Sequence, residues 1–181
     1  MEEWSANYID GAKQPTYLVT ADDVDTYLAV EVQPIDNRKR KGEIVTIFAN
    51  EHRKIVCDPD THDHIRKAMQ AGYAEHRLSL HTGFLDIYEP VTLVIKKDGI
   101  TIKAVNTTIN EKFSPTTIVS IPNGNPVEFS VNGLGSIERR FRVEQELAAG
   151  ISSRDAIVVT IRYFIKQAVE KTKTKKKGLF F

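Results

Sequence analysis

The sequence contains one cysteine and no long uncharged stretch, and each of these two features excludes a different class of protein. A single thiol, Cys57, cannot form an internal disulfide, which excludes a disulfide-stabilised secreted domain and favours a reducing compartment. No segment approaches the roughly 18 uncharged apolar residues that a transmembrane helix needs. The N-terminus has no basic region followed by an apolar run, as a signal peptide would have. We therefore expect a cytoplasmic protein.

Motifs of catalytic and cofactor sites are also lacking. The glycine-containing segments "NGNP" and "NGLGS" are typical of turns, because neither has the spacing and the lysine of a phosphate-binding loop. The sequence has no G-x-S-x-G nucleophile elbow, and the surroundings of Cys57 do not match a catalytic cysteine. The sequence predicts neither an enzyme nor a cofactor.

The positive charge of the chain is concentrated near its end. The 181 residues are 41% hydrophobic and 27% charged, which suits one domain or a small domain with part of another. The net charge is +1, but five lysines lie within residues 171–177, and without them 20 basic residues face 24 acidic ones, a charge of −4. A protein that grips nucleic acid over its whole surface is basic throughout, so nucleic acid is not the expected partner.

Residues 1–50 carry the pattern of an immunoglobulin-like β-sandwich. The segments "TYLV" and "TYLAV" alternate as half-buried strands do. Between them, Asp23 and Asp25 precede Tyr27 with the spacing of a tyrosine corner. The turn "DNRKRKG" then leads to a predicted closing strand, "GEIVTIFAN". The alternative is any antiparallel sheet with a hairpin.

A complete sandwich of this kind needs about 100 residues, and only about half that number precedes the next predicted element. We therefore predict that residues 1–50 are the C-terminal part of an immunoglobulin-like repeat, with Trp4 as its core tryptophan, and that the chain begins inside a domain. Half a sandwich would expose apolar surface and unpaired strand edges.

Residues 51–72 could be a metal site or a connecting helix, because all five histidines lie between His52 and His81. The segment "CDPDTHDHIRKAMQAG" favours the helix, with Pro59 in its first turn and Gly72 as its stop. On a helix, His62 and His64 lie about 200° apart and cannot share a metal. We predict surface histidines and no metal.

Residues 73–170 show short strands with turn signals, followed by one helix. The predicted strands lie in "YAEHRLSLHTGF", "VTLVIKKDGITIKAV", "TTIVSIP", "PVEFSVNG" and "SIERRFRVE". In "KKDGIT", Asp98 and Gly99 are expected to supply the left-handed residues of a tight hairpin turn. Six or seven strands closed by one amphipathic helix resemble a pleckstrin-homology-like barrel. A generic α+β sandwich is the alternative.

The helix is predicted from a capping box and a period of 3.6 residues. Ser152 and Asp155 have the spacing of the capping box. Arg162, Lys166 and Glu170 are expected to face away from the core. The apolar face consists of Ile157, Ile161, Phe164, Ile165 and Ala168.

The fold class predicted is therefore mainly β with α: a partial immunoglobulin-like sandwich, then a pleckstrin-like barrel with a C-terminal helix, then a basic tail at 171–181. Barrels of this kind that bind phosphoinositides cluster basic residues on their first two strands. Here Arg77, Lys96, Lys97 and Lys103 are scattered, which favours protein partners over lipid head groups.

In their order along the chain, the segments "TYLVTADDVDTYLAVEVQPIDNRKRKGEIVTIFAN", "GFLDIYEPVTLVIKKDGITIK", "EKFSPTTIVSIPNG" and "SRDAIVVTIRYFI…KKKGLFF" resemble the C-terminal end of the plant microtubule-associated family known as auxin-induced in root cultures. The resemblance implies immunoglobulin-like repeats followed by a distinctive C-terminal domain. It also implies a non-enzymatic role at cortical microtubules and at the arrays that position the division plane. The basic serine-rich region and the leucine-rich repeats of that family are missing from this chain.

The lysine run is open to four interpretations. It can be the solvated end of a helix, a contact for an acidic protein such as tubulin, a contact for an anionic membrane with Phe180 and Phe181 as a wedge, or a nuclear-import or nucleic-acid signal. A second basic segment sits in the predicted sandwich turn. The candidate partner-binding residues are Lys171, Lys173, Lys175, Lys176 and Lys177, with Arg38, Lys39, Arg40 and Lys41.

Overall fold

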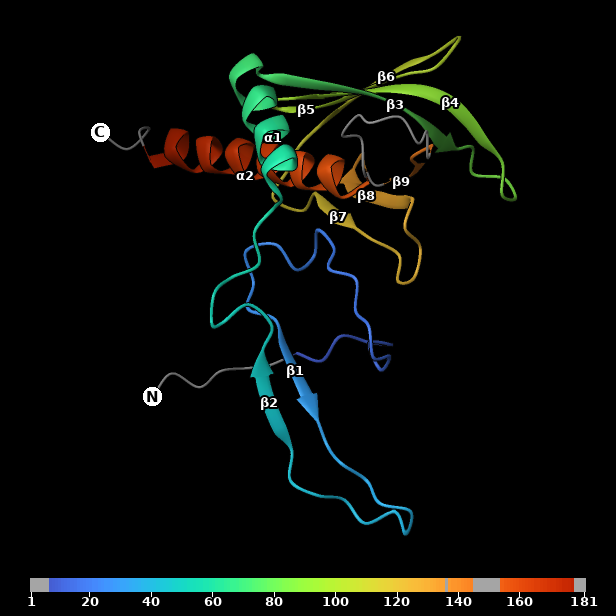
Figure 1. Cartoon of the computed structure of the whole chain (residues 1–181). Helices are drawn as coiled ribbons and strands as arrows, with labels where there is room; N and C mark the ends of the chain where they lie inside the picture. Colours follow the sequence, from blue (N-terminus) through green and yellow to red (C-terminus); the bar gives the residue numbers. More distant parts are fainter. Residues whose placement is uncertain (1–6, 136, 145–153, 178–181) are drawn as a thin grey trace.

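The computed structural model describes residues 7–135, 137–144 and 154–177. This part of the chain forms a two-stranded antiparallel sheet near the N-terminus and a seven-stranded antiparallel sheet, with two helices packed beside the larger sheet (Figure 1). The prediction of a mainly β protein with a C-terminal helix is confirmed. No helix in the described ranges is both long and apolar enough to cross a membrane.

The small sheet pairs β1 (Ala29–Val32) with β2 (Val45–Phe48). The turn between these strands is held by Asp36, whose Oδ1 accepts the backbone N–H groups of Arg38 and Arg40 at 2.8 and 2.9 Å. The predicted closing strand and its turn are therefore confirmed.

The predicted strand at "TYLV" is wrong, because residues 16–20 pair with no strand in the described part of the chain. A strand needs a neighbour to receive its backbone hydrogen bonds, and here the segment runs into a turn instead. The Tyr17 hydroxyl donates to Oδ2 of Asp23 in this turn, at 3.0 Å. The Tyr27 ring meets Phe48 edge-on at a centroid distance of 6.5 Å. Trp4 lies outside the described residues.

Helix α1 (Pro59–Ala71) confirms the connecting helix. The Asp58 carboxylate accepts the backbone N–H of Thr61 at 2.9 Å, and Gly72 ends the helix in the left-handed conformation, with φ of 80°. Helix α1 buries Ile65 and Ala68.

The large sheet has the order β6-β5-β4-β3-β9-β8-β7 and is not closed by pairing between its edge strands. Each half is a meander, and β3 joins β9 at the centre. The strands are β3 (Tyr73–His81), β4 (Tyr88–Lys96), β5 (Gly99–Lys103), β6 (Thr108–Lys112), β7 (Ile118–Ser120), β8 (Glu128–Leu134) and β9 (Ile137–Arg142). An ion pair between Glu111 on β6 and Arg139 on β9, at 3.2 Å, links the two halves.

Helix α2 (Arg154–Lys177) packs on this sheet and completes the core. Ile157, Ile161 and Phe164 are fully buried, as the 3.6-residue period predicts. Phe129 and Phe141 stack beneath the helix at a centroid distance of 5.2 Å. Seven strands followed by one C-terminal helix agree with the predicted elements, although the sheet is open and not a closed barrel.

Two details of the sheet differ from expectation. Strand β6 was not predicted, because "TINEK" contains one apolar residue and gives no strand signal. The "KKDGIT" hairpin is confirmed, but its turn residues are Lys97 and Asp98, since Lys96 pairs with Gly99. Gly99 is required by space, because a Cβ there would lie 2.1 Å from the carbonyl oxygen of Glu111.

Candidate protein-binding site

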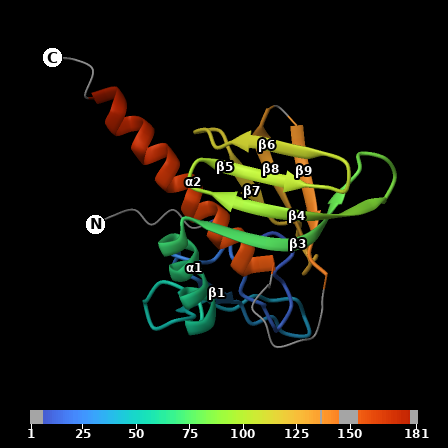
Figure 2. The same cartoon turned by 90° about the horizontal axis from the view of Figure 1, so that it is seen from above.

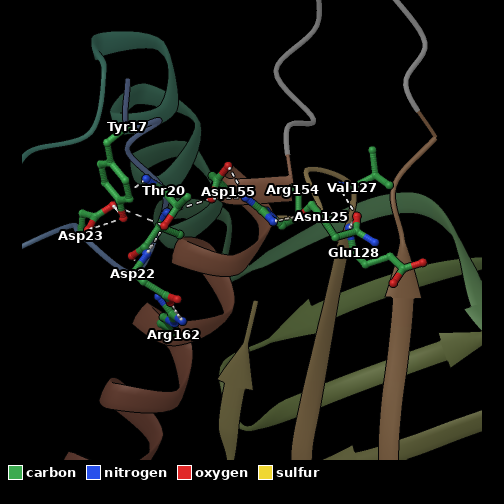
Figure 3. Close-up of polar contacts among 11 residues, drawn as sticks. Tyr17, Thr20, Asp22, Asp23, Asn125, Val127, Glu128, Arg154, Asp155 and Arg162 are labelled. Carbon is green, nitrogen blue, oxygen red and sulfur yellow. Dashed lines mark hydrogen bonds and ion pairs between the residues drawn. The ribbon is translucent and has the colours of Figure 1, made fainter. Parts of the chain in front are cut away.

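The N-terminal region is tied to the large domain through the first turns of α2 (Figure 3). Asp155 Oδ1 accepts the backbone N–H of Ala21 at 2.8 Å. Arg162 donates to the Ala21 carbonyl at 2.9 Å, pairs with Asp22, and donates to the Val119 carbonyl on β7 at 2.9 Å. Arg162 was expected to face away from the protein, but it holds this junction together. Ser152 lies outside the described residues.

The turn that carries Ala21 is rigidified by its own polar contacts. Asp23 is buried, and its carboxylate accepts the Thr20 N–H at 2.8 Å and the Tyr17 hydroxyl at 3.0 Å. Burial, together with the hydrogen bond to Asp23, raises the pKa of Tyr17 to about 12. These contacts fix the conformation of the turn, and Ala21 packs in the hydrophobic core that the large sheet and α2 share.

A second contact at the start of α2 was also missed by sequence reasoning. Arg154 is buried, and its guanidinium donates to the Asn125 carbonyl and to Asp155. The Asn125 side chain in turn accepts the N–H groups of Val127 and Glu128, at 3.0 and 3.1 Å (Figure 3). Arg154 and Asn125 lie 29 residues apart in sequence, so no local pattern points to the contact between them.

A groove lies between strand β7 and helix α2, and we call it the β7–α2 groove. Its volume is about 540 Å³. One wall is β7, where Ile118 is 60% exposed, and the other is the outer face of α2, where Ile165 and Val169 are half-buried. Its lining consists of Thr117, Ile118, Val119, Arg162, Ile165, Lys166, Val169 and Glu170. The lining is uncharged on the strand side, and on the helix side it combines Ile165 and Val169 with three charged residues.

Up to Lys177 the expected basic tail is the continuation of α2, while residues 178–181, with Phe180 and Phe181, lie outside the described residues. The helix runs to Lys177, and it projects beyond the sheet toward the C-terminus (Figure 2). From Glu170 to Thr172 the side chains are exposed. We call residues 171–177 the lysine arm; all five candidate lysines at 171, 173, 175, 176 and 177 are on this helical segment.

The second basic segment, Arg38–Lys41, lies at the tip of the β1–β2 hairpin, which points away from α2 (Figure 1). All four residues are exposed, and Arg40 pairs with Asp36 at 2.6 Å. Hydrogen bonds from Arg40 hold the pKa of the Asp36 carboxyl below its usual range. The structure therefore does not bring the two sets of candidate residues together.

One face of the hairpin is aliphatic, and no residue in the described part of the chain covers it. Val30 pairs with Ile47, and Val32 pairs with Val45, so the four side chains share a face of the sheet. Each of them is more than half exposed. The N-terminal region thus exposes apolar surface, as expected, while its assignment to an immunoglobulin-like repeat stays a prediction.

A shallow hollow of about 340 Å³ includes two of the scattered basic residues. Arg77 and Lys103 flank Thr92 across three neighbouring strands, while Glu144 contributes an opposing charge. Lys96 is not part of this lining. The hollow is therefore mixed in charge, unlike a cluster of cations around a head group.

The prediction of surface histidines is wrong for His76, which is 4% exposed on the inner face of β3. Its ring lies 5.4 Å from that of half-buried His64 on α1. Neither Nε2 atom has a hydrogen-bond partner in the described ranges. Burial lowers the pKa of both rings, that of His76 to about 4. The charge of Lys67 lowers the pKa of His64 further, and the His64 ring does the same to that of His76. Within these ranges no three His, Cys, Asp or Glu side chains are placed to hold a metal ion.

No curated protein matches the chain. A family model described as "Domain of unknown function (DUF7046)" matches residues 77–177, which run from β3 to the end of the lysine arm. This match covers more than half of the 181 residues, and the chain therefore belongs to the DUF7046 family.

Proposed function

We propose that this chain is a non-enzymatic scaffold segment that binds acidic protein surfaces, and that its target is the microtubule. The observation that carries the proposal is the lysine arm, a helical extension of α2 beyond the core. The resemblance to the auxin-induced-in-root-cultures family supports the choice of target, with cortical arrays and the division plane as the place of action.

The physical basis is long-range attraction between the arm and acidic tubulin tails. Five lysines within seven residues create a local positive potential on a body whose charge is otherwise −4. Such attraction weakens as salt shortens the Debye length, from about 10 Å at 0.1 M to about 3 Å at 1 M. Binding through the arm must therefore be strongly salt-dependent.

A second candidate function is binding to anionic membranes or phosphoinositides. It is favoured by Arg77 and Lys103 in one hollow, and Glu144 in the same lining argues against it. The same lysine arm would also attract an anionic bilayer, by about 1 kcal/mol per lysine near the surface.

The test is co-sedimentation with taxol-stabilised microtubules across a salt series. The intact chain is compared with a variant in which the five arm lysines are replaced by glutamine, a good helix former that keeps the length of α2. A third protein carries glutamine at Arg38, Lys39, Arg40 and Lys41 and is the matched control for loss of charge.

We expect salt-sensitive binding by the intact chain and by the hairpin-tip control, and loss of binding by the arm variant. Equal binding by the arm variant, or none by the intact chain, would contradict the proposal. Binding of the intact chain to phosphatidylserine vesicles, without binding to microtubules, would favour the membrane alternative instead.

A further inference from the structure

We propose that β6, an edge strand of the large sheet, is a self-association surface on which the β6 strand of a second copy of this chain pairs antiparallel, about a two-fold axis at Asn110. The pairing joins the large sheets of two molecules into one continuous sheet. The inference goes beyond the proposed function, because its partner is a second copy of this chain and it does not depend on microtubules.

The first support is the direction of the backbone groups along β6, which its flanking residues reveal. Phe113 follows β6, and its backbone N–H donates to the Asp98 carbonyl at 2.8 Å. Thr107 precedes β6, and its carbonyl accepts the backbone N–H of Ala104 at 2.8 Å. In an antiparallel ladder, residues that bond to the neighbouring strand alternate with residues whose N–H and C=O point away from it. Since both flanking residues bond toward β5, every second residue between them does so too.

Three residues of β6 consequently turn their backbone N–H and C=O groups to the open side of the sheet. These residues are Thr108, Asn110 and Lys112, and all three are exposed. Within the described ranges, no other residue forms a hydrogen bond with these backbone groups. Such a row of unpaired donors and acceptors is a template for pairing with another chain.

The opposite edge of the sheet differs, because its backbone groups are already engaged. Beside β7, the Val119 carbonyl accepts from Arg162 at 2.9 Å. The backbone N–H of Thr117 donates to the Ser114 carbonyl at 3.0 Å. Of the two edges of the large sheet, β6 is therefore the one that can receive a new strand.

The second support is the sequence of β6, "TINEK", which is compatible with pairing to itself. Antiparallel pairing centred on Asn110 sets Thr108 opposite Lys112 of the second copy. Ile109 then lies opposite Glu111 of the second copy. No like charges are directly opposite one another, and the strand contains no proline that would interrupt the ladder.

Charge does not oppose this arrangement. The two Glu111 carboxylates lie diagonally across the axis, but each is already paired with Arg139 of its own copy at 3.2 Å. The strand carries one acidic and one basic residue, and the net charge of the chain is +1. A net charge close to zero favours association. Two-fold symmetry uses the same edge of both copies, so the assembly closes as a dimer.

The experiment is sedimentation equilibrium of the full chain over a series of protein concentrations, with two variants of one residue. Asn110→Pro removes an N–H that points out of the sheet, a position where an edge strand tolerates proline, so the monomer should keep its fold. Asn110→Thr is the matched control, because it keeps the backbone N–H. Both variants remove the side-chain oxygen that accepts the Thr101 hydroxyl at 2.8 Å. Circular dichroism checks that both are folded.

We expect a reversible equilibrium between monomer and dimer. A small interface of this kind gives weak association. Asn110→Pro should weaken it at least roughly ten-fold, which corresponds to about 1.4 kcal/mol, and Asn110→Thr should leave it nearly unchanged. A chain that stays monomeric up to about 1 mM would overturn the proposal. A dimer that Asn110→Pro leaves intact would also overturn it, and would assign association to another surface, such as the aliphatic face of the β1–β2 hairpin.

A second measurement needs no variant. Amide hydrogen exchange of the intact chain is followed by NMR at low and at high protein concentration. The N–H groups of Thr108, Asn110 and Lys112 should exchange rapidly in the monomer and slowly in the dimer, whereas those of Ile109 and Glu111 should be protected in both. A dimer without this alternation would contradict pairing at β6.

The two proposals fail independently. Dimerisation without microtubule binding would leave the β6 surface standing and remove the tubulin target. Microtubule binding by a chain that stays monomeric would do the reverse. If both hold, the dimer carries two lysine arms, and Asn110→Pro should weaken microtubule binding through loss of avidity.

Discussion

The two sheets of this molecule differ in what covers them. The seven-stranded sheet is covered by α2 and supplies a continuous core, whereas none of the described residues covers the aliphatic face of the β1–β2 hairpin. In the described part of the chain, every buried hydrophobic residue except Ala21 lies at or after Ile65. The free energy of folding must therefore come almost entirely from the second region, which contains the large sheet and the two helices.

The comparison also shows what keeps the first region in place. A lone two-stranded hairpin is at best marginally stable in water. Here the hairpin is anchored through the turn that inserts Ala21 into the core and through the contacts of Arg162 and Asp155. We infer that the two regions unfold separately, with the N-terminal one held by a few polar contacts, and the following experiments test this.

The largest effect is expected in the core of the second region. Phe164→Ala removes a fully buried ring from α2 and should lower the free energy of unfolding by about 3–5 kcal/mol, through lost burial and the cavity left behind. Urea denaturation followed by circular dichroism measures it. The adjacent Tyr163 is 48% exposed, and Tyr163→Ala should cost within about 0.5 kcal/mol. Similar losses for both variants would contradict the assigned core.

The next effect is a dependence of stability on pH. Because the pKa of buried His76 is lowered from 6.5 to about 4, the unfolded chain binds more protons than the folded one between these values. The free energy of unfolding should thus be highest above pH 6.5 and fall as the pH drops toward 4, by roughly 3 kcal/mol at most. His76→Gln should flatten this dependence, measured by urea denaturation across the pH range. Exposed His62→Gln is the control and should leave the slope unchanged.

A smaller, local effect is expected at the junction between the regions. Arg162→Met removes the donors to Ala21 and Val119 and the ion pair with Asp22. Losing these contacts should cost about 1–3 kcal/mol of local stability. Hydrogen exchange should accelerate in residues 17–26 and stay slow in β3 and β4. Arg66→Met, which breaks only the exposed pair with Asp63, should change neither. Uniform acceleration over the whole chain would show that the two regions unfold together.

The smallest effect is expected on the hairpin itself. Replacing Val30 and Ile47 by threonine keeps β-branched side chains and removes exposed apolar surface, so the free energy of unfolding should change by no more than about 0.5 kcal/mol. Binding of the dye ANS should decrease. A loss of several kcal/mol would mean that this face is covered in solution.

Local signals predicted the elements that depend on neighbours in sequence. Helix α1 begins at Pro59 and ends before Gly72 as its caps indicate, and α2 buries the face that its period marks. Strand β6 gave no signal because its partners, not its composition, make it a strand. The segment around Tyr17 had the pattern of a strand but lacks a neighbour in the described chain.

The candidate site also has one part that the sequence reveals and another that only the folded arrangement reveals. The lysine arm is evident from composition, although its helical form follows only from the continuation of α2. The β7–α2 groove could not be predicted, since "TTIVSIP" does not reveal which strand ends the sheet or which helix lies beside it. The contact between His64 and His76 could not be predicted either, because one ring lies on helix α1 and the other on strand β3.

By itself, the sequence determined the mainly β class, the two helices, the local positive charge and the absence of recognised catalytic motifs, because each depends on residue type and short-range spacing. Only the tertiary structure decided that Ala21 completes the core, that Arg162 joins the two regions and that β7 ends the sheet beside α2. These properties depend on contacts between residues far apart in the chain, where burial and the pairing of backbone groups select one arrangement among many that the local pattern allows.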